Sequence, residues 1–568
     1  MLKRRIPIGI EEYREVVERD YYYVDKTLLI KELMDQWTKV FLLTRPRRFG
    51  KTLGLSMVQT FFEDARDETG AKIDYARYFD GKKIMDAGEA YTLHMGNYPV
   101  IKLSLKSAKQ PDFETAYANL VKDIAKEYRR HKYVMNSEVL TEHEKQTYQE
   151  LMEERAEYHQ YTVALKFLSE CLERYHGKQT VILIDEYDVP LENAWFEGFY
   201  DRMIKFIRSL FESALKTNEH LAFAVITGCL RISRESIFTG LNNLKVVSIL
   251  DTTFGEHFGF VPDEVEEMLD FYEIGHCKEA AKKWYDGYLF GDTEVYNPWS
   301  IINYVADTIS GTTKFPRPYW SNTSSNSIVR ELIERADVQV RREIEHLLEG
   351  GTIEKPIHED ITYGDVYDSQ DNLWNFLFFT GYLKKCDERQ DVRTIYLTMS
   401  IPNDEIAYIY ENTVLAWFDK KIRKTDMTPL MQAIEEGDCE AFGKFLSAQL
   451  MDTISFFDYK ESYYHGFLAG ILKCSQKYVV LSNREAGMGR SDIMLQDYAE
   501  GKKGIVLELK VAKKYSEMEK KCDEALEQIE NMQYEQELRE DGYEEIIKYG
   551  ISFFKKRCMV KKFCFMEK

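Results

Sequence analysis

The chain has 568 residues, of which 44% are hydrophobic, 30% are charged and only 12 are proline. This mixture supports buried cores and about three or four domains, and it excludes wholesale disorder and collagen-like repetition. The 76 basic and 96 acidic residues give a formal net charge of −20, so only a local basic patch could bind nucleic acid or anionic membrane.

The nine cysteines are scattered and form no C-x-x-C pair, which is typical of reduced thiols and not of a disulfide framework. The apolar stretch at the N-terminus ends at Glu11, too early for a signal peptide. No stretch is apolar over the roughly 18 residues that a membrane helix needs. We therefore expect a cytoplasmic protein without a membrane span.

Short apolar runs alternate with helical stretches in the first part of the chain. The runs cover residues 40–44, 99–105, 180–184, 221–226 and 246–250. Short strands joined by long crossovers indicate a parallel sheet, so the expected fold class is α/β. We expect this core over residues 1–255 and a helical lid over residues 256–310.

The stretch 311–440 gives weaker signals. Residues 373–383 (LWNFLFFTGYL) predict a buried helix, and residues 393–400 predict a strand. A plain helical bridge is the favoured interpretation, and a winged-helix-like unit is the alternative.

Residues 441–568 show a different order of predicted helices and strands, which predicts a second, smaller α/β domain. Its expected elements are a helix near 455–473, strands at 478–482, 492–496 and 504–509, a helix at 518–532 and a strand at 549–554.

A candidate phosphate-binding loop, residues 44–52 (TRPRRFGKT), follows the first predicted strand. Gly50 permits close approach of the backbone to phosphate, at the start of a helix whose dipole favours an anion. Lys51 can reach the β- and γ-phosphates, and Thr52 can hold Mg²⁺. The general pattern has glycine at position 45, where this chain has Arg45.

The third predicted strand ends in two acids, Asp185 and Glu186. Asp185 would hold Mg²⁺ through water, Glu186 would polarise the attacking water, and Asp188 could replace either. The alternative is that these acids only cap a helix that begins at Tyr187. We expect this strand to neighbour the strand of the phosphate loop.

The fourth predicted strand ends at Thr227, whose hydroxyl would sense the γ-phosphate between the two motifs. Beyond it, Arg231 and Arg234 either supply positive charge to the transition state, in cis or from a second copy of the chain, or pair with Glu235 on the surface. The expected cofactors are ATP and Mg²⁺.

Several separated motifs together resemble those of the AAA-ATPase-like family of bacterial proteins, over residues 5–300. They are P-I-G-I at 7–10, Y-V-D-K-T at 23–27, T-R-P-R-R-F-G-K-T at 44–52, I-D-E-Y-D-V-P at 184–190, T-G-C-L-R-I-S at 227–233, Y-D-G-Y at 285–288 and Y-N-P at 296–298. The family carries R-P-R-R-F in its loop, so the resemblance implies that Arg47, Arg48 and Phe49 belong to the nucleotide site. It also implies kinship with signal-transduction (STAND) ATPases, which switch between nucleotide states and are not processive motors.

The last part of the chain carries two carboxylates and a lysine on neighbouring predicted strands. Asp492 starts one strand, and Glu508 and Lys510 lie on one face of the next, because side chains alternate. Two converging carboxylates suit one or two Mg²⁺ ions, which prefer oxygen ligands. The metal would activate water and stabilise the leaving oxygen of a phosphodiester, while Lys510 orients the nucleophile or offsets charge.

This D-x15-E-x-K arrangement, with G-R-S before the aspartate, resembles the PD-(D/E)XK nuclease superfamily over residues 455–560. The resemblance implies a restriction-endonuclease-like domain, a polar role for Gln528 on the following helix, and a further acid on the preceding helix. Glu461 is the first candidate for that acid and His465 the second. The alternatives are a surface network of Asp, Glu and Lys, and a nuclease fold without activity.

Basic residues gather near this second site and near the end of the chain. They are Lys502, Lys503, Lys513, Lys514, Lys520, Lys521, Lys555, Lys556, Arg557, Lys561 and Lys562. Such a patch could bind a nucleic-acid backbone, DNA first of all, in a salt-sensitive way. Solvated lysines on an ordinary surface are the default interpretation.

The sequence thus predicts a multidomain α/β protein with a P-loop NTPase sheet, a helical lid and middle region, and a C-terminal restriction-endonuclease-like domain. The predicted function is an ATP-regulated, Mg²⁺-dependent nuclease, in which the ATPase switches or assembles the phosphodiesterase site, for example as a homo-oligomer. A role in bacterial defence or mobile-element control follows only by analogy. The alternative is an ATP-switched interaction scaffold whose inactive nuclease fold binds nucleic acid or protein.

Overall fold

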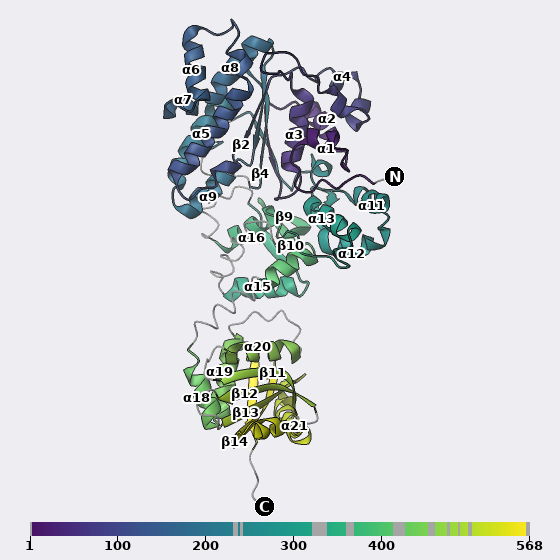
Figure 1. Cartoon of the computed structure of the whole chain (residues 1–568), viewed down its shortest axis with the longest axis vertical. Helices are drawn as coiled ribbons and strands as arrows, with labels where there is room; N and C mark the ends of the chain where they lie inside the picture. Colours follow the sequence, from purple (N-terminus) through teal and green to yellow (C-terminus); the bar gives the residue numbers. More distant parts are fainter. Residues whose placement is uncertain are drawn as a thin grey trace, which may run out of the picture. The chain divides into compact units, whose positions relative to one another are not determined.

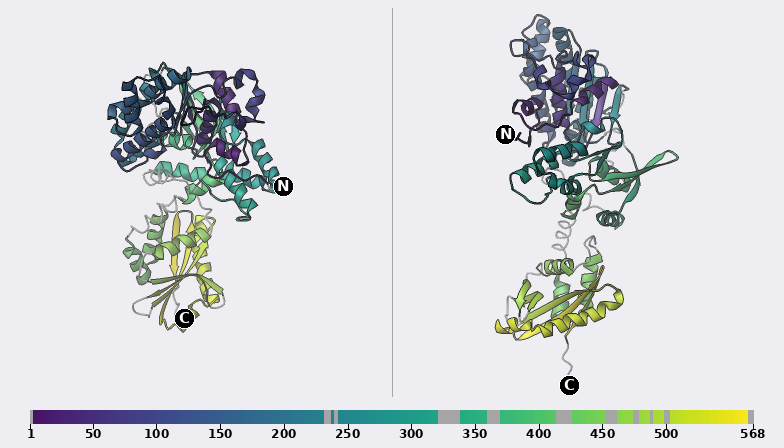
Figure 2. Two further views of the ribbon diagram at one scale, coloured as in Figure 1. Left: turned by 45° about the horizontal axis from the view of Figure 1, so that its top comes forward. Right: turned by 90° about the vertical axis from the view of Figure 1, so that its right-hand side faces the viewer.

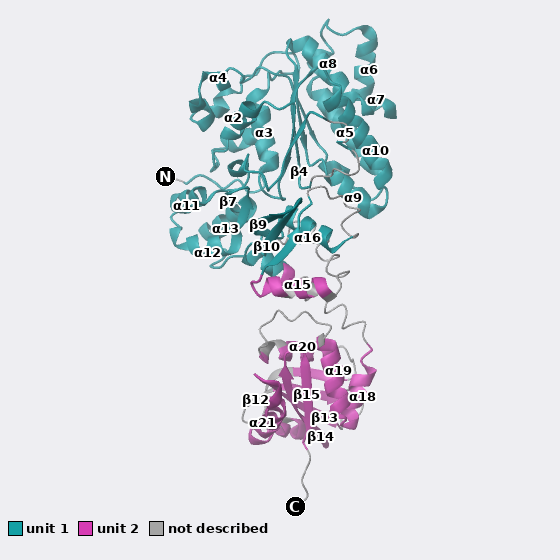
Figure 3. Ribbon diagram, turned by 180° about the vertical axis from the view of Figure 1, so that it is seen from behind, with its two compact units in different colours: residues 1–324, 352–409 teal, residues 325–351, 410–568 magenta. Residues whose placement is uncertain are grey.

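The structure, a computed structural model, describes most of the chain: residues 3–230, 237–238, 242–320, 338–358, 369–412, 426–451, 461–473, 478–486, 489–497 and 503–563. The chain divides into two compact units (Figures 1 and 3), namely Met1–Ser324 with Thr352–Ile409, and Ser325–Gly351 with Tyr410–Lys568. Arg231, Arg234 and the first residues of the helix expected at 455–473 lie outside the described residues.

The first unit contains a five-stranded parallel sheet in the order β2-β3-β4-β1-β5. Its strands are β1 (Val40–Thr44), β2 (Val100–Ser104), β3 (Thr180–Asp185), β4 (Leu221–Gly228) and β5 (Leu244–Val247). Strands β1 and β3 are buried along their whole length, as expected for central parallel strands. The predicted parallel α/β fold is confirmed.

The strand order corrects one expectation. Strand β4 pairs with β1 on one side and with β3 on the other, so the acidic strand does not neighbour the strand of the phosphate loop. After β1 the chain forms β2 at the edge of the sheet and then β3 beside β2. Strand β4 lies between β3 and β1. Thr227, at the end of β4, therefore lies between the two motifs, as predicted.

Helices cover both faces of this sheet (Figure 1). Helices α1 to α3 lie on one face and α5 to α8 on the other. The helices used below are α1 (Tyr13–Glu18), α2 (Leu28–Gln36), α3 (Lys51–Phe62), α5 (Phe113–Arg130), α6 (Glu142–Met152), α7 (Tyr158–Thr162), α8 (Ala164–His176), α9 (Val189–Glu197) and α10 (Tyr200–Phe211).

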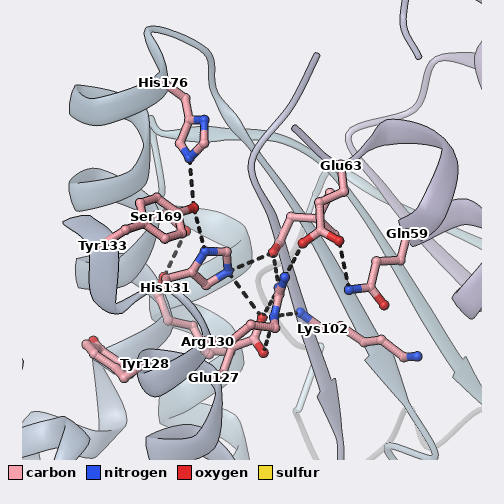
Figure 4. Close-up of polar contacts among 12 residues, drawn as sticks. Gln59, Glu63, Lys102, Glu127, Tyr128, Arg130, His131, Tyr133, Ser169 and His176 are labelled. Atoms are coloured by element: carbon pink, nitrogen blue, oxygen red, sulfur yellow. Dashed lines mark hydrogen bonds and ion pairs between the residues drawn. The ribbon is translucent and has the colours of Figure 1, made fainter. Parts of the chain in front are cut away.

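A buried polar network joins α3, α5 and α8 beside the amino end of β2 (Figure 4). Arg130 forms ion pairs with Glu63 and Glu127. Glu127 also accepts the backbone N–H of Lys102 at 2.8 Å. These charges are therefore paired, as charges removed from water must be.

The rest of the first unit follows the sheet in sequence. It comprises α11 (Pro262–Phe271), α12 (Lys278–Tyr285), the hairpin β6 (Tyr288–Phe290) and β7 (Thr293–Val295), α13 (Pro298–Ile309), β8 (Ile353–Pro356), α16 (Gln370–Phe379), β9 (Lys384–Asp391) and β10 (Thr394–Ser400). Strands β8, β10 and β9 form an antiparallel sheet, and Figure 2 shows the β9–β10 hairpin reaching out from the unit. This sheet contradicts the favoured expectation of a plain helical bridge. A helix followed by a hairpin suits the alternative, a winged-helix-like unit, which stays a prediction, as do the domain boundaries.

The second unit contains a mixed five-stranded sheet in the order β11-β12-β13-β14-β15. Only the β13–β14 pair is parallel. The strands are β11 (Tyr478–Ala486), β12 (Gly489–Asp497), β13 (Lys503–Val511), β14 (Glu545–Phe554) and β15 (Arg557–Lys562). This confirms the expected second α/β fold and adds β15, which the sequence pattern did not indicate.

Different helices cover the two faces of the second sheet. They are α18 (Thr428–Glu436), α19 (Cys439–Met451) and α20 (Glu461–Lys473) on one face, and α21 (Met518–Asn531) and α22 (Glu535–Glu540) on the other. Ile493 and Leu507 pack on the first face, and Met494 and Val506 pack on the second.

In the described part of the chain, no helix combines the length and the apolar character that crossing a membrane requires.

Candidate functional site

The phosphate loop joins β1 to α3. Gly50 precedes the helix with φ 82°, and nothing lies within 4 Å of where a Cβ would stand. The first amide groups of α3 have no acceptor within the helix, and this suits an anion. The buried Lys51 donates hydrogen bonds to the carbonyl oxygens of Arg45 (2.8 Å) and Pro46 (2.7 Å), so its ammonium lies inside the curve of the loop.

Arg45 points away from the loop that it begins. Its fully buried guanidinium donates to the carbonyl oxygens of Val247 (3.2 Å) and Ser248 (2.8 Å) and lies over the rings of Phe258 and Phe290. Burial lowers its pKa to about 10, which still leaves it charged. The arginine at the usual glycine position thus leaves the phosphate cradle free and ties the loop to the end of β5.

Three polar side chains meet where β1, β4 and β3 end. Asp185 accepts a hydrogen bond from Thr52 (2.6 Å) on one carboxylate oxygen and from Thr227 on the other. Glu186 follows with a left-handed φ of 52°, and its burial beside Asp185 raises its pKa. The structure therefore brings together the four residues that the sequence pattern placed around Mg²⁺ and the γ-phosphate.

Asp188 has a different place. One of its oxygens accepts the backbone N–H groups of Cys229 (2.7 Å) and Leu230 (3.2 Å), just beyond β4. The Asp188 carboxylate thus fixes the backbone after Thr227. This argues that Asp188 supports the site and does not take the role of Asp185 or Glu186.

The remaining loop residues contact the surroundings of the loop. Arg47 pairs with the buried Glu192 of α9. The Arg48 guanidinium lies 4.4 Å from the centre of the Trp299 ring on α13. Phe49 is buried, and its ring packs on the aromatic side chains of the β6–β7 hairpin. Arg47 and Arg48 thus contact residues of α9 and α13, whereas the Phe49 ring anchors the loop.

In the second unit, Asp492 and Glu508 stand just beyond the last paired residues of β12 and β13, Ile493 and Leu507. Asp492 accepts the backbone N–H of Leu509 at 2.8 Å, and its own N–H lies 3.4 Å from a Glu508 carboxylate oxygen. Beyond Ile493 and Leu507, the two strands are thus joined by hydrogen bonds between backbone N–H groups and these carboxylates, in place of bonds between backbone groups.

Lys510 completes this group, with its ammonium 3.1 Å from Glu508. Glu508 is only 1% exposed, and burial, followed by the charge of Asp492, raises its pKa to about 7. Burial opposes the charge of Lys510, but Glu508, Glu461 and Asp492 outweigh it and raise the lysine pKa. A cation is therefore electrostatically favoured between the two carboxylates.

The supporting candidates lie on the flanking helices. On α20, Glu461 is exposed, and His465 lies 2.8 Å from the backbone carbonyl oxygen of Asp492. Gln528 of α21 donates to the hydroxyl of Tyr534 at 3.2 Å. Helix α21 passes close to β14 at Gly550, the residue paired with Glu508, where a Cβ would lie 2.2 Å from a helix carbonyl oxygen.

Comparisons with known proteins match the two units separately. Residues 7–238 match the family described as "Predicted AAA-ATPase", and residues 459–563 match the PD-(D/E)XK nuclease superfamily. One segment of the chain is therefore similar to predicted AAA-ATPases and another to nucleases of the PD-(D/E)XK superfamily. An uncharacterized protein in the vnfD 5′ region of Azotobacter chroococcum mcd 1 is 28% identical over 341 residues, which cover 59% of this chain and 57% of that relative. The matched part thus spans little more than half of the relative.

The residues present fit a divalent cation at both sites. In the ATPase segment, Thr52 and Asp185 offer a hydroxyl and a carboxylate already in contact. In the nuclease-superfamily domain, Asp492 and Glu508 offer carboxylate oxygens, the hard ligands that Mg²⁺ prefers while it keeps several waters. Within the described residues no group of three or more His, Cys, Asp or Glu side chains is arranged to hold a metal, so water and substrate oxygens would complete either site.

Tyr534 was missed by the sequence analysis. It is 2% exposed, packs with Met494 and Val506 on the Glu508 side of the sheet, and is bonded to Gln528. Burial raises its pKa, and the charges of Glu508 and Asp492 add to that effect. No periodic signal links it to Gln528, because the chain turns at Gln533, where φ is 53°.

Proposed function

We propose that this protein is an ATP-regulated, Mg²⁺-dependent nuclease. The observation that carries the proposal is the pair Asp492 and Glu508, one of them buried, with Lys510 3.1 Å from Glu508. A buried carboxylate beside a second one is unfavourable without a cation. Its place in a domain of the PD-(D/E)XK nuclease superfamily supports a phosphodiester substrate.

The nuclease residues have distinct roles in this proposal. Asp492 and Glu508 would hold the metal, which supplies an activated water and stabilises the leaving oxygen when bound. Lys510 orients the attacking water and offsets negative charge near Glu508. The hydroxyl oxygen of Tyr534 accepts a hydrogen bond from Gln528, so its hydrogen would be the donor to a ligand at this site.

The residues around the nucleotide also have distinct roles in this proposal. The amide groups after Gly50 and the ammonium of Lys51 bind the β- and γ-phosphates. Thr52 and Asp185 hold the cation in place, and Thr227 reports on the γ-phosphate through the same carboxylate. Glu186, whose pKa is raised by burial, orients and polarises water as the base.

The test is cleavage of a mixed panel of DNA and RNA with Mg²⁺, with and without ATP. We expect the wild type to cut and Glu508→Ala to be inactive, with Glu519→Ala, an exposed acid of α21, as the matched control. A change in cutting on addition of ATP, abolished in Lys51→Ala, is expected from the coupling. Cutting that survives in Glu508→Ala would overturn the site assignment, and no cutting under any condition would favour the scaffold function.

A further inference from the structure

The phosphate loop is supported from outside the sheet, by the turn that ends α16. Gly381 lies so close to the loop that a Cβ on it would stand 3.0 Å from Cβ and 3.3 Å from Cγ of Pro46. Real Cβ contacts are rarely this short, so a side chain at position 381 would push the loop or the turn. Pro46 is also the residue whose carbonyl oxygen accepts a 2.7 Å hydrogen bond from Lys51.

The turn itself is a regular helix end. The N–H of Gly381 bonds to the carbonyl of Phe378 (3.0 Å) and that of Tyr382 to Leu377 (2.8 Å), which is a Schellman motif with glycine at φ 90°. Such a turn is rigid because its backbone groups are paired. It therefore presents Gly381 to Pro46 at a fixed position.

The support continues into the body of the first unit. The ring of Tyr382 stacks on Trp320, with centres 5.1 Å apart, and Trp320 lies 3.3 Å from the position of a Gly381 Cβ. The backbone N–H of Trp320 donates to the buried Glu405 (2.8 Å), which also accepts from Ser300 of α13 (2.7 Å). The turn is thus connected to α13 and to the segment after β10.

We propose that Gly381 is a positioning residue of the nucleotide site, and that the contact between Gly381 and Pro46 transmits occupancy of the phosphate loop to α16 and the β9–β10 hairpin. The inference rests on the proposed nucleotide binding. When a phosphate attracts Lys51, the hydrogen bond from its ammonium to the carbonyl oxygen of Pro46 weakens. The Pro46 ring then moves against the turn. If nucleotide binding and the position of the turn are coupled in this way, a change at position 381 alters nucleotide affinity.

The chain offers a matched control for the test. Gly311 ends α13 with φ 69° in the same Schellman arrangement, its N–H bonded to Thr308 (3.2 Å) and that of Thr312 to Asp307 (2.9 Å). Nothing lies within 4 Å of its Cβ position. Gly381→Ala and Gly311→Ala therefore both place an alanine at a left-handed φ, and only the first one also presses on Pro46 and Trp320.

The experiment is a titration of the full-length protein with a fluorescent ATP analogue and Mg²⁺. We expect Gly381→Ala to bind about 10-fold more weakly than the wild type, within the usual range of coupling between sites, and Gly311→Ala to bind within about twofold of it. Equal weakening in both variants, or none in either, would overturn the inference. Absence of binding by the wild type would instead count against the proposed nucleotide site.

A second readout begins with the wild-type protein, whose folding no substitution affects. In the wild type, ATP is expected to change amide hydrogen exchange in the peptides that cover α16 and β9–β10. Gly311→Ala should keep this response and Gly381→Ala should lose most of it. If ATP binds but exchange in these peptides is unchanged, the contact transmits nothing and the inference fails.

Discussion

The hydroxyl of Thr52, at the start of α3, donates a 2.6 Å hydrogen bond to the carboxylate of Asp185 at the end of β3, although β4 lies between β3 and β1, the strand that leads into the loop before α3. Thr227, at the end of that intervening strand, donates to the other oxygen of the same carboxylate. Both oxygens of Asp185 are therefore oriented before any ligand arrives. Such preorganisation is what a site that discriminates between nucleotide states needs.

Thr52→Val tests this arrangement, because valine keeps the shape and removes the hydroxyl. We expect the gain in ATP affinity on adding Mg²⁺ to fall by about 10-fold, since an interaction of about 1.4 kcal/mol with the cation is lost. Thr52→Ser should restore it. ATP titrations in Mg²⁺ and in EDTA measure the effect, and a variant with an unchanged Mg²⁺ effect would remove Thr52 from the cation site.

Arg45→Gly restores the general phosphate-loop pattern, yet we expect it to destabilise the fold by about 3–5 kcal/mol. The change removes the Arg45 donor from the carbonyl oxygens of Val247 and Ser248, and it removes a buried positive charge that interacts with Asp251 and Glu32. Denaturant unfolding measures the loss. Arg155→Gly, at an exposed position, is the control and should change stability by less than about 0.5 kcal/mol. A stable Arg45→Gly protein would contradict the anchoring role.

Local sequence signals were enough for the five strands of the first sheet, for four of the five strands of the second sheet and for both motifs, because each depends on a few adjacent residues. Asp492 and Glu508 were predicted to converge because they lie on neighbouring predicted strands, and β12 does pair with β13. The position of β4 between β1 and β3 was not predicted, because strand order is set by long-range packing and not by propensity. The contact between Pro46 and Gly381, far apart in the sequence, has the same origin.

Tyr534→Phe removes one hydroxyl and keeps the ring that packs on Met494 and Val506. We expect cleavage to slow by about 5–10-fold, as for loss of one hydrogen bond of about 1 kcal/mol, with little change in stability. Tyr543→Phe, a partly buried tyrosine beside the same cluster, is the control. Luminescence of bound Tb³⁺, excited through nearby tyrosines, should fall in Tyr534→Phe alone; equal signals in all proteins would place Tyr534 away from the metal.

Lys513 and Lys514 are exposed directly after β13, the strand that carries Glu508 and Lys510. If they contact phosphates, the double change to alanine should weaken DNA binding and lower the slope of log affinity against log salt by about 2. Lys444→Ala is the control, because this exposed lysine pairs with Glu440 on α19. Binding measured over a series of salt concentrations decides the matter, and an unchanged slope would exclude the two lysines from the interface.

The histidines at the ends of α5 and α8 predict how stability depends on pH. Tyr133 bridges His131 and His176 with contacts of 2.9 Å to each ring. Burial is the largest effect on both rings and lowers the pKa of each, although Glu127 faces His131 and Asp64 faces His176 and both carboxylates oppose the shift. Arg130 adds to the lowering at His131, and Arg66 does so at His176.

Because the folded state holds these rings neutral, their contribution is complete above the unfolded pKa of about 6.5 and is lost as the pH falls below it. Each unit of lowering corresponds to about 1.4 kcal/mol. We expect the melting temperature to drop between pH 7 and pH 5, and to drop less in the double variant His131→Asn with His176→Asn. The exposed His159, changed to asparagine, should leave the slope as in the wild type. A double variant with the wild-type slope would mean that other groups, and not these two rings, cause the acid sensitivity.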